Sequence, residues 1–155
     1  MFTVRKLSKV GLIAGAALAL AVAFTSLSSN DVSADNHADR NAAMKSLGGA
    51  LKALGGAVAG GDAAEAQKIA AKVSATAAEI PALFKDGKAG ANRAKAEIWS
   101  NFSDFTAKAN ALKAAADSVA ADAAAGKLGS DPKAVVGKLG ATCGACHKAY
   151  RGPKV

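Results

Sequence analysis

The sequence predicts an all-α protein folded as an antiparallel four-helix bundle. Alanine, the best helix former, accounts for 42 of the 155 residues. The β-branched and aromatic residues that strands favour are too few for a β-sandwich. The 51% apolar composition is too high for a disordered chain. At this length we expect one domain, and two cysteines exclude a framework of several disulfides.

The first 34 residues have the features of a cleaved signal peptide. Arg5, Lys6 and Lys9 form a positive start, Val10–Phe24 is an uncharged apolar run, and Val32-Ser33-Ala34 fits the small-residue pattern before a cleavage point. An uncleaved membrane anchor is the alternative, but a spanning helix needs ~20 apolar residues. We therefore predict a signal peptide over residues 1–34 and an exported domain over residues 35–155, with no stable membrane anchor after cleavage. Its net charge would be +6.

The first two helical segments follow directly. The first runs from about Asn36 to Ala59, with an apolar stripe at three- and four-residue steps, and ends at Gly60-Gly61. The second opens at Asp62, whose distance from Glu65 is that of a capping box. Pro81 should kink or interrupt the last turn of this segment.

A loop over residues 85–92 leads to the third and fourth segments. The third is predicted as one continuous helix from about Ala94 to Ala125, ended by Gly126. The fourth starts at Asp131-Pro132, a cap followed by proline at the first helical position, and stops at Gly152-Pro153. Apolar residues of the third segment form a heptad seam: Ile98, Phe102, Phe105, Ala109, Leu112, Ala116 and Val119.

Alanine on the helix faces predicts a thin core. Four amphipathic helices with short connections fit an antiparallel bundle. Burying alanine gains far less than burying leucine, at ~0.8 kcal/mol per CH₂ group. A large apolar cofactor would supply the missing buried surface.

The motif that carries chemistry is Cys143-Gly144-Ala145-Cys146-His147. Cys-x-x-Cys-His is the signature of haem c attachment, in which two thiols on one helical turn bond the two vinyl groups of a porphyrin and the histidine binds the iron. A thioredoxin-type disulfide would need a βαβ context, which is absent. A zinc site would need four ligands, and His37 is the only other histidine or cysteine. A functionless occurrence of the motif is the third alternative, and the sequence favours haem c over all three.

At this point the chain resembles a known family, the class II c-type cytochromes or cytochromes c′. Residues 143–151 match the family's ending, a Cys-x-x-Cys-His motif followed by an aromatic–arginine pair. Ile98-Trp99 matches a recurrent pair on the third helix, and residues 40–45 match the first-helix motif. The resemblance covers essentially all of residues 35–155 and implies a four-helix bundle with one covalent haem c near the C-terminus, in the periplasm.

The resemblance also implies roles for residues of the first helix. Arg40 corresponds to an arginine that interacts with a haem propionate; the alternative is a solvated surface arginine. Asn41 corresponds to a position near the haem edge, or else is plain surface. The family often has threonine, a basic residue and proline in the stretch before Ile98-Trp99. Here Arg93 is the basic residue, but the threonine and the proline are absent, so no haem contact is carried over from residues 92–96.

Met44 decides between two functions. By composition alone, methionine in a helical stripe is core filler. In the family this position holds either an apolar residue that blocks the sixth coordination site or, in the low-spin branch, a methionine that binds iron. The residues that follow it, including Leu47-Gly48-Gly49, are more similar to the low-spin branch. We therefore predict His147 and Met44 as iron ligands, with Cys143 and Cys146 as the attachment residues.

Two function classes follow from this. The first is a carrier of single electrons between redox proteins that the sequence does not identify. The second is a five-coordinate haem protein that binds or buffers NO or CO. An enzyme is not expected, because no distal histidine or histidine–arginine pair suited to acid–base work is visible. The spread of lysines gives no sign of nucleic-acid binding, and the resemblance allows a homodimer through the first two helices.

Overall fold

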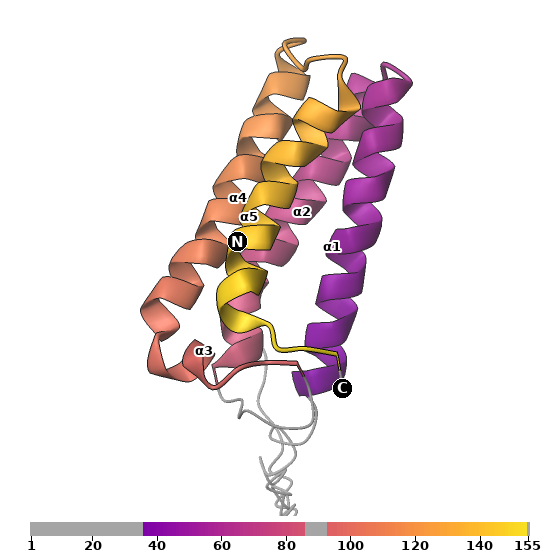
Figure 1. Ribbon diagram of the computed structural model, residues 1–155. Helices are drawn as coiled ribbons and strands as arrows, with labels where there is room; N and C mark the ends of the chain where they lie inside the picture. The colour runs from indigo at the N-terminus through magenta and orange to yellow at the C-terminus, as the bar shows by residue number, and fades with distance from the viewer. Residues whose placement is uncertain (1–35, 86–92, 155) are drawn as a thin grey trace, which may run out of the picture.

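The computed structural model describes residues 36–85 and 93–154 (Figure 1). The helices in this part of the chain are α1 Asn36–Ala59, α2 Ala63–Phe84, α3 Glu97–Ser100, α4 Phe102–Ala124 and α5 Pro132–Tyr150. None of these helices is long and apolar enough to cross a membrane. The predicted signal peptide and residues 86–92 of the predicted loop lie outside the described residues.

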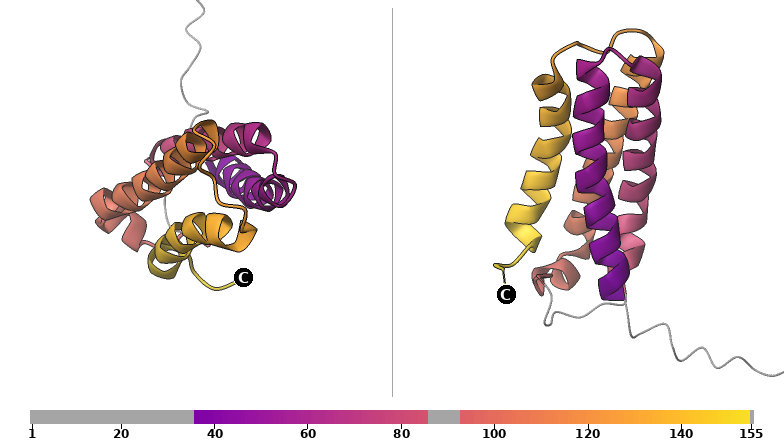
Figure 2. Two further views of the ribbon diagram at one scale, coloured as in Figure 1. Left: turned by 90° about the horizontal axis from the view of Figure 1, so that it is seen from above. Right: turned by 90° about the vertical axis from the view of Figure 1, so that its right-hand side faces the viewer.

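The four long helices form the predicted antiparallel bundle. α1 packs against α2, α2 against α4, α4 against α5, and α5 back against α1, an arrangement seen from above in Figure 2. The contact between α2 and α4 is the most extensive, whereas α5 packs less closely on both of its neighbours. The start of α1, the end of α2, the start of α4 and the end of α5 meet beside α3, at what we call the α3 end of the bundle (Figure 1).

Glycine and aspartate end and begin the helices as predicted. Gly61 and Gly126 have φ angles of 69° and 66°, in the left-handed region that glycine tolerates. In each case the next backbone N–H donates to the carbonyl five residues back, at 2.9 and 2.8 Å, which is the Schellman motif. Asp62 and Asp131 cap α2 and α5, each accepting a backbone N–H at 2.9 Å.

The third predicted segment is two helices rather than one. α3 ends at Ser100 and α4 begins at Phe102, with Asn101 between them at φ −128° and ψ 44°. Residues 93–95 are not helical and pair with the end of α5 instead. The apolar spacing continues across Asn101, since Ile98 and Phe105 are both buried, so the pattern gives no sign of the break in the backbone.

Pro81 lies inside α2, which nevertheless continues to Phe84, so the predicted interruption is wrong. Side chains from other elements bind the carbonyls of this last turn. Arg40 Nε donates to the carbonyl of Leu83 at 2.8 Å, and Trp99 Nε1 donates to the carbonyl of Phe84 at 2.7 Å. These hydrogen bonds satisfy two of the acceptors that a helix C-terminus leaves free.

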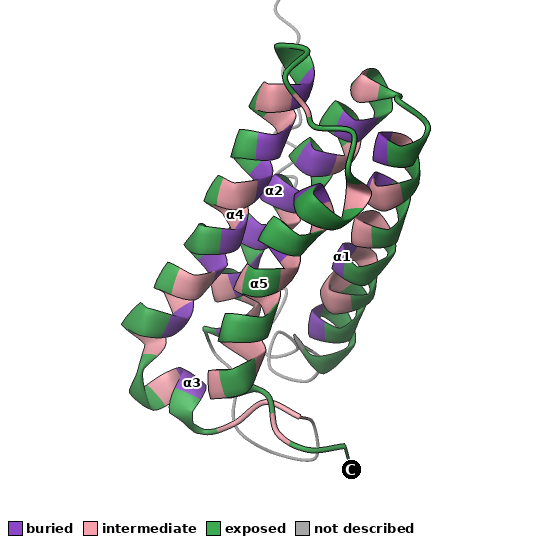
Figure 3. Ribbon diagram, turned by 45° about the horizontal axis from the view of Figure 1, so that its top comes forward, coloured by how far each residue is buried: buried purple, intermediate pink, exposed green. Residues whose placement is uncertain are grey.

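The core runs along the bundle and is rich in alanine. The buried faces of the long helices point toward one another (Figure 3). One polar contact crosses from α2 to α4, where the buried Ser74 donates to Asp117, which also accepts from Lys113 at 2.7 Å. The buried alanines are Ala66, Ala70, Ala77, Ala109, Ala116 and Ala123.

Candidate functional site

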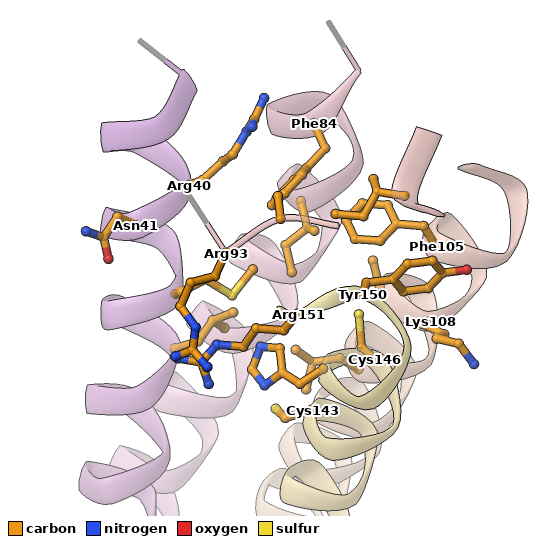
Figure 4. A pocket seen from close by; sticks show the side chains of 18 of the residues that line it. Arg40, Asn41, Phe84, Arg93, Phe105, Lys108, Cys143, Cys146, Tyr150 and Arg151 are labelled. Atoms are coloured by element: carbon orange, nitrogen blue, oxygen red, sulfur yellow. The ribbon is translucent and has the colours of Figure 1, made fainter. Parts of the chain in front are cut away.

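A cavity of about 530 Å³ opens at the α3 end of the bundle (Figure 4). Its walls come from α1, α2, α4 and α5, and from the segment that precedes α3. Aliphatic and aromatic side chains such as Leu47, Ile80 and Phe105 form much of the lining. The structure brings all of the predicted site residues to this cavity: Arg40, Asn41, Met44, Cys143, Cys146 and His147.

The last turns of α5 supply the two thiols and the imidazole. Cys143 and Cys146 are one helical turn apart, half-buried and not joined in a disulfide. Burial is the main cause that raises the pKa of both thiols, so they stay protonated at neutral pH. This is the state in which an S–H bond can add across a vinyl group.

His147 also faces the cavity from α5. Burial lowers the pKa of its imidazole, and the nearby guanidinium groups of Arg151 and Arg93 lower it further. The neutral ring that results keeps a nitrogen lone pair available, which is the form that binds metal ions.

The opposite wall belongs to the first turns of α1. Met44 is partly buried against the core and lines the cavity. Asn41 is exposed at the rim, and Figure 4 shows its side chain directed away from the other labelled residues. Met44 therefore lines the cavity from a different helix than His147, whereas Asn41 is at the edge of the site.

Arg40 is buried, with 7% of its surface exposed, so the alternative of a solvated surface arginine is wrong. Besides its hydrogen bond to Leu83, its guanidinium lies 4.5 Å from the ring centre of Phe84 and 5.9 Å from that of Trp99. Burial lowers its pKa from a very high ordinary value, and the group stays charged. The N–H groups of the Arg40 guanidinium other than Nε–H are the ones that could bind a propionate.

The segment before α3 is tied to the end of α5. Gly152 N donates to the carbonyl of Arg93 at 2.7 Å, and Lys95 N donates to that of Tyr150 at 3.1 Å. Arg93 Nε donates to the carbonyls of Gly152 and Pro153 at 3.0 and 3.1 Å. These bonds hold the end of α5 in place and bring Arg93 to the cavity.

Arg93 is a residue of the site that neither the sequence pattern nor the resemblance predicts. No contact was carried over from residues 92–96, because that stretch departs from the family pattern. The basic residue of the pattern is nevertheless retained at Arg93, and it was the available signal. Arg40, Arg93 and Arg151 are the arginines of the described ranges; all of them line the cavity, and none is within ion-pair distance of a described carboxylate.

Tyr150 closes the inner wall beside the thiols. Its ring packs edge-on against Phe105, with 5.4 Å between ring centres. Its hydroxyl donates to Asp104 Oδ2 at 2.5 Å. The hydrogen bond to the Asp104 carboxylate, together with burial, raises the pKa of Tyr150 to about 12.

Tyr150 is the sole tyrosine of the chain, so its ionisation can be followed alone in ultraviolet difference spectra. We expect a midpoint near pH 12, and Asp104→Asn should lower it toward the ordinary value of about 10. Because the folded pKa is the higher one, this stabilisation is complete below pH 10 and is lost as the pH rises from 10 to 12. Asp122→Asn, a charge removal elsewhere on α4, is the control. Equal midpoints in the wild type and Asp104→Asn would contradict the assignment.

The cavity fits haem c better than a metal alone. Within residues 36–85 and 93–154, no group of three or more histidine, cysteine, aspartate or glutamate side chains is placed to hold a metal ion. The lining instead offers two thiols and an imidazole from one helix. It also offers an apolar wall, and arginines that pair with no described carboxylate and could bind two propionates.

Comparisons with known proteins agree with this geometry. The family model described as Cytochrome C′ matches residues 35–151. A "Cytochrome c-556" from Agrobacterium tumefaciens (strain II Chrys) is 44% identical over 71 residues, which cover 46% of this chain and 57% of that protein. A "Cytochrome c′" from Pararhodospirillum photometricum is 39% identical over 74 residues, which cover 46% and 58%. The alignments thus span little more than half the length of these curated relatives.

Solved structures align over more of the chain. Ferric cytochrome c prime from Alcaligenes xylosoxidans has a TM-score of 0.67 at 31% identity, over 77% of this chain and 95% of that one. Cytochrome c′ from Thermochromatium tepidum has a TM-score of 0.63 at 30% identity, over 76% and 95%. Some similar structures are nitric oxide complexes of variants of the Alcaligenes protein.

Proposed function

Because the chain belongs to the cytochrome c′ family and carries one covalently bound haem c, we propose that it transfers single electrons between redox proteins. The observation that carries this proposal is the position of Met44 on α1 and His147 on α5, which line one cavity from two different helices. A haem held in this cavity could take one iron ligand from each of these side chains. A coordination sphere that is already complete changes little between the two oxidation states, which suits outer-sphere transfer.

Each group of the site has a role in this proposal. The bound haem would supply a one-electron Fe(II)/Fe(III) couple. Cys143 and Cys146 hold the cofactor covalently, and His147 and Met44 bind its iron, a ligand pair that raises the reduction potential. The apolar wall keeps water from the cofactor, and Arg40 binds a propionate.

A second function is favoured by the nitric oxide complexes among the similar structures. In that case Met44 would cover an open sixth position without bonding to iron, and the protein would bind or buffer NO or CO. The fold and the haem attachment are the same in both cases, so only the state of the iron separates them.

Optical spectra of the purified protein in both oxidation states test the proposal. We expect low-spin iron in both states, with a weak sulfur-to-iron charge-transfer band in the ferric form. The ferrous protein should bind CO slowly or weakly. A high-spin spectrum with rapid CO binding would reject the carrier and support the gas-binding alternative.

The cellular setting and the assembly are proposals as well. We propose a periplasmic location, supported by the signal-like residues 1–34 and by the family. A homodimer through α1 and α2 is supported by small exposed residues of α1, including Gly49 and Ala53, which would let a second copy approach closely. We propose no enzymatic activity and no nucleic-acid partner, for the reasons given from the sequence.

A further inference from the structure

Lysine and arginine side chains line the cavity, and most of them form no ion pair with a described carboxylate. Among the described residues, five lysine and arginine side chains line it, whereas no described aspartate or glutamate does. Lys108 Nζ is 3.6 Å from Asp104 and is therefore partly neutralised. The other four form no ion pair with a carboxylate in the described part of the chain. They are Arg40, Arg93, Arg151 and Lys154.

The haem cannot neutralise all four. A bound haem would bring two negative charges on its propionates, so these four described side chains would keep an excess of about two positive charges. Arg40 is buried and directed at the end of α2, so it contributes little to this surface charge. The excess lies on what we call the cationic rim, which consists of Arg93, Arg151 and Lys154.

The cationic rim is accessible and compact. Arg151 and Lys154 are exposed and Arg93 is half-buried. Figure 4 shows the side chains of Arg93 and Arg151 directed toward one another at the cavity. Both line the same cavity, and positive charges on one rim repel each other unless an anion binds there. The hydrogen bonds between residues 93–95 and the end of α5 hold them in this arrangement.

We propose that the cationic rim is the docking surface for a redox partner whose own redox centre is surrounded by carboxylates. This inference rests on the proposed electron transfer. A partner bound at the rim lies over the cavity opening, which gives electrons their shortest route. Opposite surface charges speed such encounters, and the effect falls with ionic strength.

A protein fits the rim better than an anionic membrane does. Lipid-binding clusters contain about four to eight basic residues next to an apolar helix face, whereas the rim has three, grouped around a concave opening. Carboxylates on a protein surface can enter such an opening, where each can form two parallel hydrogen bonds with a guanidinium group.

Electron exchange with small reagents tests the rim. The ferrous protein gives one electron to ferricyanide, an anion, or to tris(phenanthroline)cobalt(III), a cation, and stopped-flow absorbance gives both rates. We expect the ferricyanide rate to fall as ionic strength rises. In Lys154→Glu that rate should drop about fivefold at low salt, while the rate with the cobalt complex rises. Polyglutamate should slow ferricyanide oxidation of the wild type and should have little effect on Lys154→Glu.

The control variant is Lys127→Glu, which makes the same charge change in the exposed connection between α4 and α5, at the opposite end of the bundle. Its ferricyanide rate should change less than twofold. Lys154→Gln, which removes one charge where Lys154→Glu reverses it, gives a second measure of the rim and should show a smaller drop in the ferricyanide rate. Equal effects of Lys127→Glu and Lys154→Glu would overturn the docking site in favour of overall charge. Rim-dependent binding to phosphatidylglycerol vesicles, with no effect of polyglutamate, would overturn it in favour of a membrane.

The same experiments distinguish failure of the proposed function from failure of the docking surface. If neither reagent exchanges electrons with the protein and its iron is high-spin, the carrier itself is rejected. If both reagents react but neither rate depends on ionic strength or on Lys154, the carrier stands and the docking surface is rejected.

Discussion

Replacing both Cys143 and Cys146 with alanine should prevent haem attachment and lower the melting temperature by at least about 20 °C. The reason is the thin core, in which alanines occupy many of the buried positions. Leaving a void of about 530 Å³ costs ~24 cal/mol per Å³, so the free energy of unfolding would fall by at most about 13 kcal/mol. The whole free energy of unfolding of a typical domain is only ~5–15 kcal/mol. Because water enters through the opening, the real loss is smaller, but about 5 kcal/mol is enough for a 20 °C shift.

Thermal melting followed by circular dichroism measures this effect, on protein from cells that attach haem c. The single variants Cys143→Ala and Cys146→Ala are the controls, because each removes the same packing at one thiol and leaves one thioether to hold the haem. Each should melt well above the double variant. A haem-free double variant that melts within a few degrees of the wild type would show that the alanine core is sufficient without the cofactor.

Local signals in the sequence predict where the helices begin and end, but they do not predict where a helix breaks or continues. Gly61, Gly126 and Asp131 mark helix ends through backbone geometry and capping, which depend on residues next to them. The break at Asn101 accompanies the pairing of residues 93–95 with the end of α5. The continuation of α2 past Pro81 likewise coincides with hydrogen bonds from other elements to its last carbonyls. Contacts between distant segments leave no periodic trace in the sequence.

The site follows the same division. Cys143, Cys146 and His147 share one helical turn, so their spacing alone was enough to bring them to one cavity. Arg40 was placed there by a resemblance, which did not reveal its contacts with α2 and the ring of Phe84. Arg93 reaches the cavity through hydrogen bonds to a segment about 60 residues away, which its local sequence does not encode.

Met44→Ala should have the second largest effect, this time on the iron rather than on the fold. If the Met44 thioether binds iron, the variant loses the sulfur-to-iron charge-transfer band, becomes high-spin and binds CO rapidly. Its reduction potential should also fall, because a methionine ligand favours Fe(II). For a one-electron couple each tenfold difference in ligand affinity between the oxidation states is worth ~59 mV, so a hundredfold preference predicts a fall of about 120 mV.

Spectroelectrochemistry and CO flash photolysis separate bonding from crowding when Met44→Leu is measured beside Met44→Ala. Leucine fills nearly the same volume but has no donor atom, so under ligation both variants lose the band and the potential falls in both. Only Met44→Ala then opens the site fully to CO, because the leucine side chain still obstructs it. Histidine ligation by His147 should survive in both, since α5 is untouched. If the wild type is already high-spin and Met44→Leu reproduces its spectrum and potential, Met44 acts only by its bulk. The protein then belongs with the gas-binding members of its family.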